Sequence, residues 1–183
     1  MGHYDNLRVK NLHMGGQLSG LRKKTESITA AKLIHETESG ALFQINVAAN
    51  ADADITLPEI TAGNVGVTYG FFLGTANTGA LRIVTSTISD TTGDIFVGSL
   101  LNITSVANGT DTAGVMAVVP AGDDNAIVLD ENLTNAAVQV GSYIECTAFS
   151  YSSTAHSKWI VNGYIINDTA TGTGAALFTD RDA

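Results

Sequence analysis

The sequence has 183 residues, a size at which one folded domain buries roughly 70% of the surface that its unfolded chain exposes. Charged residues make up only 15% of the chain and its net charge is −9, so the acidic body is a poor partner for nucleic acid. No apolar run approaches the ~20 residues of a membrane helix, and the N-terminus lacks an apolar signal core. We therefore expect one domain, no nucleic-acid partner, no membrane partner and synthesis in the cytoplasm.

Residues 1–26 are predicted to form an extended N-terminal arm. Glycines at positions 15, 16 and 20 interrupt their apolar spacing, so the segment cannot build a core of its own. Residues 1–38 carry six of the nine basic residues against four acids, a net charge of +2, which leaves −11 for residues 39–183. Such an arm is expected to order against a neighbouring subunit or a larger, acidic partner surface.

Residues 27–167 are predicted to form the domain itself. Residues 28–35 fit either a short helix capped by Ser27 or the start of a strand. Beyond Ala41, short apolar and β-branched runs alternate with Gly, Asn, Asp and Thr turns, which is typical of sandwiches and barrels. The runs are residues 42–47, 55–60, 65–73, 81–85, 95–101, 103–106, 115–119, 126–129, 138–148 and 159–166. They predict an all-β fold, a β-sandwich or jelly-roll/barrel-like domain of about ten short antiparallel strands.

Residues 168–183 are predicted to form a flexible C-terminal tail with one hydrophobic anchor at Ala176–Phe178. The single cysteine, Cys146, falls in a strand-like run and is expected to be a small core residue. Among the aromatic residues, we expect Tyr4 and Tyr151 to be exposed and the others to pack in the core.

The residues give no positive sign of catalysis. The four histidines lie at positions 3, 13, 35 and 156, without the spacing of metal ligands. Acidic pairs such as Asp90/Asp94 and Asp123/Asp124 are interpreted as turn residues and solvated acids, although they leave open a weak surface calcium site. The sequence therefore predicts no catalytic residue, no cofactor and no dedicated metal site.

Several motifs, taken in order, resemble a β module of bacteriophage structural proteins, found in head decoration (capsid cement) proteins and in fibres. They are Ser39-Gly40, Phe43-Gln-Ile45, Ile55-Thr-Leu-Pro58, Gly66–Leu73, Ile83-Val84, Gly98, Val140–Glu145 and Ser157-Lys-Trp-Ile-Val-Asn-Gly163. The resemblance covers roughly residues 27–166, while residues 107–124 depart from it as an insertion.

The resemblance implies a non-catalytic virion protein that binds the exterior of an assembled phage capsid as a homotrimer and stabilises it. Its partner would be the major capsid protein of the same particle, and the N-terminal arm would contact the shell. We assign the contact to the apolar and basic side chains of the arm: Leu7, Arg8, Val9, Lys10, Leu12, Leu18 and Leu21.

Two other classes of protein fit the same residues. A tail-fibre or receptor-binding module would present aromatic and acidic residues in loops, such as residues 107–124 or 151–156, to a host surface glycan. A small hydrolase or lyase would need His35, His156 and two carboxylates gathered within hydrogen-bond reach.

Overall fold

The structure is a computed structural model that describes residues 23–86, 92–104, 114–130, 138–167 and 177–180. Within these ranges the chain forms thirteen strands and one short 3-10 helix, η1 (Glu36–Glu38). The strands are β1 (Thr25–Ile28), β2 (Lys32–Leu33), β3 (Leu42–Ile45), β4 (Ala53–Thr56), β5 (Thr68–Leu73), β6 (Leu81–Val84), β7 (Asp94–Gly98), β8 (Leu100–Thr104), β9 (Gly114–Val118), β10 (Ala126–Val128), β11 (Tyr143–Ser150), β12 (Ser157–Asn167) and β13 (Phe178–Thr179). The prediction of an all-β domain is confirmed.

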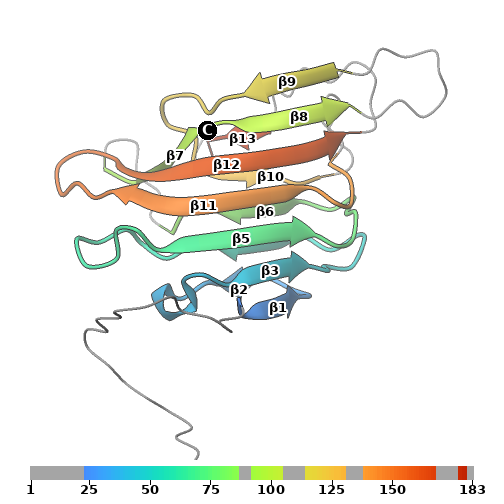
Figure 1. Cartoon of the computed structure of the whole chain (residues 1–183), viewed down its shortest axis with the longest axis horizontal. Coiled ribbons are helices and arrows are strands. Elements are labelled where there is room, and N and C mark those ends of the chain that lie inside the picture. Colours follow the sequence, from blue (N-terminus) through green and yellow to red (C-terminus); the bar gives the residue numbers. More distant parts are fainter. Residues whose placement is uncertain (1–22, 87–91, 105–113, 131–137, 168–176, 181–183) are drawn as a thin grey trace, which may run out of the picture.

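The strands form two layers. The eight-stranded sheet has the order β1-β3-β5-β11-β12-β8-β9, and β7 also pairs with β12. The five-stranded sheet has the order β13-β10-β6-β4-β2 and lies behind the first in Figure 1. The sandwich form of the prediction therefore describes the domain.

The expectation that the strands pair in antiparallel fashion was wrong. Of the eleven strand pairs in the described residues, six are parallel and five antiparallel. The first six strands alternate between the sheets, so β1, β3 and β5 are parallel neighbours in one layer while β2, β4 and β6 are parallel neighbours in the other. A chain that crosses to the opposite sheet after each strand returns to the first sheet in its original direction.

The start of the domain is extended. Ser27 and Ile28 belong to β1, and Lys32 and Leu33 form β2, so the strand alternative for residues 28–35 is correct and the helix alternative is wrong. Because β1 begins at Thr25, the last two residues of the predicted arm also lie in the sheet.

Two apolar runs divide differently from the prediction. The run 138–148 contains only one strand, which begins at Tyr143, because Gly141 turns the chain at φ +98°. The run 95–101 is split at Gly98, whose φ is +104° and whose missing side chain lets the backbone approach the Val161 carbonyl. Through this break β7 and β8 both pair with β12, one after the other.

The core lies between the two sheets and is centred on aromatic side chains. Trp159 and Tyr69 are fully buried with ring centroids 5.9 Å apart, and Phe43 stacks on Phe71 at 5.6 Å. The Tyr69 hydroxyl is satisfied by donating to the carbonyl of His35 at 3.2 Å. Cys146 is fully buried, as predicted for a core residue.

The chain end also contributes to this core. Leu177 and Phe178 are buried, and β13 pairs with the antiparallel β10. This part of the predicted tail is therefore a strand of the five-stranded sheet. The two apolar side chains of the predicted anchor hold it there, because they are buried in the core.

Candidate binding surfaces

The capsid-contact residues predicted in the arm, Leu7, Arg8, Val9, Lys10, Leu12, Leu18 and Leu21, lie outside the described residues. The excess of basic residues near the N-terminus suggested this contact, and Lys24 and Lys32 are among those that lie within the described residues. Lys32 Nζ lies 2.8 Å from Glu26 and 3.2 Å from Glu38, and Lys24 Nζ lies 2.9 Å and 3.4 Å from the same two carboxylates. Two of the six basic residues are thus neutralised within the chain. The other four basic residues of this stretch are at positions 8, 10, 22 and 23, and of these the structure describes Lys23.

The Lys24/Lys32 cluster ties the first strands of the two sheets together. The hydrogen bond from Lys32, followed by that from Lys24, lowers the pKa of Glu26 to about 2. Lys32 also lies over the Phe43 ring, 5.5 Å from its centroid. The cluster therefore has a structural role where the predicted arm enters the domain.

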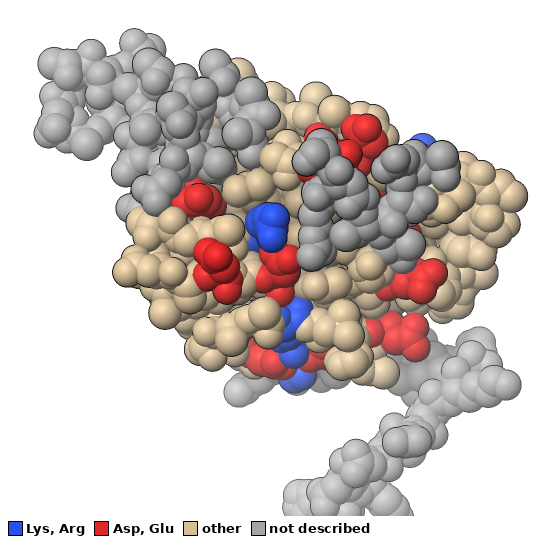
Figure 2. Space-filling view, turned by 180° about the vertical axis from the view of Figure 1, so that it is seen from behind, with Lys and Arg blue, Asp and Glu red and all other residues tan. Residues whose placement is uncertain are grey.

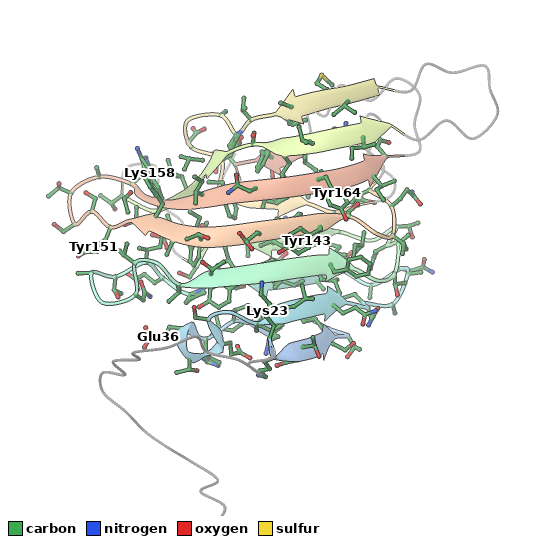
Figure 3. The ribbon with its side chains drawn as sticks, viewed as in Figure 1. Lys23, Glu36, Tyr143, Tyr151, Lys158 and Tyr164 are labelled. Atoms are coloured by element: carbon green, nitrogen blue, oxygen red, sulfur yellow. The ribbon has the colours of Figure 1, made fainter. Side chains whose placement is uncertain are left out.

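An aromatic row crosses the outer face of the eight-stranded sheet. Phe72, Tyr143, Tyr164 and Leu101 lie opposite one another on β5, β11, β12 and β8. The rings of Tyr143 and Tyr164 are 6.4 Å apart and lie side by side on the front of the sheet in Figure 3. Sequence reasoning placed these aromatics in the core. The alternation along β11 carries the signal that could have found Tyr143, because it shares the outward face with Glu145 and Thr147 while Ile144, Cys146 and Ala148 are buried.

The same sheet ends in an uncharged edge. Four residues of β9 are exposed. We use the name apolar edge for the exposed apolar side chains on β9 and directly beside it. Its members are Leu101, Val115, Met116 and Val119, which are 45%, 66%, 41% and 66% exposed. The sequence predicted this strand but not its exposure, because an apolar run is ordinarily buried.

The outer face of the five-stranded sheet has a different character. Figure 2 shows acidic side chains spread over this side of the molecule, with few basic ones among them. Its ordered ion pair joins Arg82 on β6 to Asp54 on β4, with Nε 2.9 Å from the carboxylate. This face therefore suits a cationic partner better than an apolar one.

A small polar pocket of about 250 Å³, the hairpin pocket, lies where three segments meet. Its lining residues are Glu59, Ile60, Thr92, Asp94, Tyr151, Ser152, Ser153 and Ser157. Tyr151 comes from the turn between β11 and β12, at the left end of the molecule in Figure 3, and is 45% exposed, as predicted.

Asp94 is the unusual member of this pocket. It was expected to be a solvated turn acid, but it is the first residue of β7 and only 3% exposed. Burial raises the pKa of its carboxyl to about 6, and the nearby negative charge of Glu59 adds to the rise. The backbone N–H of Ile60 donates to the carboxyl at 3.0 Å. The Trp159 indole faces the same group without reaching regular hydrogen-bond geometry, and offsets the rise slightly.

A second, larger hollow is an open groove of about 500 Å³ at the same end of the sandwich, to which Leu33, His35, Glu36, Pro58 and Glu59 contribute. His35 thus lies at this groove. His156 instead places its Nδ1 3.0 Å from the carbonyl of Gly93. The structure therefore gives the two imidazoles different neighbours.

Across the described ranges, no three His, Cys, Asp or Glu side chains are placed to hold a metal ion. The part of the chain that the structure describes also contains no helix long and apolar enough to cross a membrane. Comparison with protein-family models, with curated proteins and with solved structures gave no match to this chain. The function must therefore be argued from its surfaces.

Proposed function

We propose that this chain is a non-catalytic structural protein of a virus particle, a decoration subunit that binds the exterior of an assembled phage capsid as a trimer. The proposal begins from the resemblance of residues 27–166 to phage β modules. The observation that supports it best is the apolar edge, an uncharged and exposed strand side in a chain of net charge −9.

Edge strands usually carry lysine, proline or a covering loop, because their free N–H and C=O groups pair readily with another chain. No residue of β9 is charged, and Val115 and Met116 point to opposite faces of the strand. Two copies of an acidic protein repel each other least where both surfaces are uncharged. A neighbouring subunit is therefore the occupant that we assign to the apolar edge.

The shell contact is assigned to the N-terminal arm. Lys24 and Lys32 are already paired to Glu26 and Glu38, so we assign the positive charge of the contact to the other four basic residues of this stretch, at positions 8, 10, 22 and 23. A ligand that binds only the assembled shell stabilises it by mass action. Three arms joined in one trimer bind more tightly than one, because each first contact raises the effective concentration of the others.

Two measurements test the proposal. Light scattering after size exclusion should give the mass of a trimer, and Val115→Lys should reduce it to a monomer while Val140→Lys, at another exposed valine outside the strands, leaves it unchanged. A monomeric parent protein, or a V115K variant that stays trimeric, would contradict the assignment of the apolar edge.

Deletion of residues 1–21, which spares β1, should leave a folded trimer that no longer co-sediments with capsids of its own particle. Substituting only Arg8 and Lys10 by Gln should weaken binding in part and reduce its dependence on salt. Capsid binding that survives the deletion would show that the arm is not the contact.

A further inference from the structure

The hairpin pocket is built from parts of the chain that are distant in sequence. Glu59 and Ile60 follow β4, Thr92 precedes β7, and Asp94 is its first residue. The remaining lining residues come from the turn between β11 and β12 and, for Ser157, from the first position of β12. Figure 3 shows Tyr151 where β11 passes into that turn, at the end of the sandwich away from the aromatic row of Tyr143 and Tyr164. A pocket of this kind exists only in the folded chain.

The walls of the pocket are held in place before any ligand arrives. In the turn, Ser152 N–H donates to Ser157 Oγ at 3.1 Å, and Ser152 Oγ accepts from the N–H of Ala155 at 3.0 Å. His156 Nδ1 joins the turn to the Gly93 carbonyl, next to Asp94, at 3.0 Å. Because these contacts fix the loop, binding costs little conformational entropy.

The chemistry of the pocket combines one aromatic face with many oxygen groups. Tyr151 offers an exposed ring, whose π face attracts the slightly positive C–H groups of a ligand. Asp94 and Glu59 provide hydrogen-bond acceptors, and the serine side chains can both donate and accept. Hydroxyl groups next to a flat C–H face are the complement of this set, and they are the features of a sugar ring.

The charge and the volume of the hairpin pocket restrict the class of ligand further. Two carboxylates in a chain of net charge −9 repel phosphates, uronic acids and sialic acids. The pocket volume of about 250 Å³ lies just below the range of pockets for drug-sized ligands, which begins at about 300 Å³. We infer that the hairpin pocket is a binding site for one terminal unit of a neutral glycan, with Tyr151 as the stacking platform and Asp94 and Glu59 as acceptors.

This inference does not depend on the capsid proposal, because it uses a different end of the molecule from the apolar edge. A decoration subunit with such a site would add adhesion to its structural role. A glycan-binding site would suit a receptor-binding module as well as a decoration subunit. A positive result in the glycan test below therefore does not choose between these two classes, and the capsid-binding assay still decides the proposed function.

The test uses the full chain on an array of immobilised glycans that carry terminal galactose, glucose, mannose, N-acetylated hexosamines or sialic acid. We expect binding to at least one neutral terminus and none to the sialylated ones, and NMR titration with the matching free sugar should give a Kd in the millimolar range or tighter. Binding to no neutral terminus, or preference for sialylated glycans, would overturn the inference.

Matched variants locate the site. Tyr151→Ala should weaken binding at least tenfold and Glu59→Gln at least fivefold, and both side chains are exposed, so the fold should persist. Phe149→Ala is the control for Tyr151, since Phe149 is 60% exposed on the same strand end but is no lining residue. Glu145→Gln is the control for Glu59. Equal loss in a control and its partner variant, or no loss in either pocket variant, would place the site elsewhere.

Discussion

The carboxyl group of Asp94 accepts a hydrogen bond from the backbone N–H of Ile60 at 3.0 Å, and so fixes the segment after β4 to the start of β7. The two residues are 34 positions apart in the chain. Asp94 is only 3% exposed, so its negative charge is largely shielded from water. Its one hydrogen bond of regular geometry comes from a neutral donor, the Ile60 N–H. The contact therefore connects the geometry of the hairpin pocket to the pH dependence of stability.

We predict that Asp94 makes the folded chain less stable as the pH rises. Its pKa is 3.8 in an ordinary setting and about 6 in the fold, so between about pH 4 and pH 6 the folded state binds more protons than the unfolded state. The free energy of unfolding should then fall across this window, by about 3 kcal/mol from this one group. Glu26, whose pKa is lowered to about 2, acts in the opposite direction and only at lower pH.

The variant Asp94→Asn isolates this effect, because it keeps an acceptor for Ile60 and removes the charge. Urea unfolding at pH 4 and pH 7 should show that the stability of the variant relative to the parent protein rises with pH. Parallel stability curves for the two proteins would mean that Asp94 does not titrate in this range.

Lys32 should contribute more to stability than Lys24, although both pair with the same two carboxylates. Lys32 is the more buried of the two, at 22% against 59% side-chain exposure, and it also contacts the Phe43 ring. We expect Lys32→Met to cost about 1 kcal/mol of unfolding free energy, and Lys24→Met to cost clearly less. Chemical unfolding at low and high salt would check this, and equal losses would show that burial is not what distinguishes the pairs.

Gly98 should tolerate no side chain. Its φ is +104°, and a Cβ atom would meet the Val161 carbonyl of the neighbouring strand. We expect Gly98→Ala to lower the free energy of unfolding by at least about 2 kcal/mol, because backbone strain and a steric clash add. Gly122→Ala is the control, since the space around Gly122 is open, and its effect should stay within about 0.5 kcal/mol. Similar values for both variants would contradict the packing of β7 on β12.

The Cys146 thiol should be unreactive in the native protein. It is fully buried, and burial raises its pKa well above the ordinary value, so the reactive thiolate is scarce. At pH 8, a thiol reagent should label the native protein only as fast as the fold opens around Cys146. In denaturant it should label the thiol completely. Rapid labelling without denaturant would show that β11 opens locally far more easily than the core does.

The all-β class could be read from the sequence because short β-branched runs alternate with turn residues, and the core positions of Phe43, Phe71 and Trp159 follow from those runs. The exposure of Tyr151 was also correct, since a polar serine turn surrounds it. The outward exposure of Tyr143 and Tyr164 was not predicted, because an apolar residue in a strand has the same appearance on either face. The arm residues that we assign to the capsid remain a prediction.

What the sequence by itself determined is local: which segments are extended, and that Cys146, the single cysteine, has no partner for an intrachain disulfide. Tertiary structure alone decided which strands pair, and in which direction, because backbone hydrogen bonds between strands carry no record of side-chain identity. It also decided the state of Asp94. Its pKa is raised chiefly by burial, which arises because chain segments far apart in sequence pack around the carboxyl group.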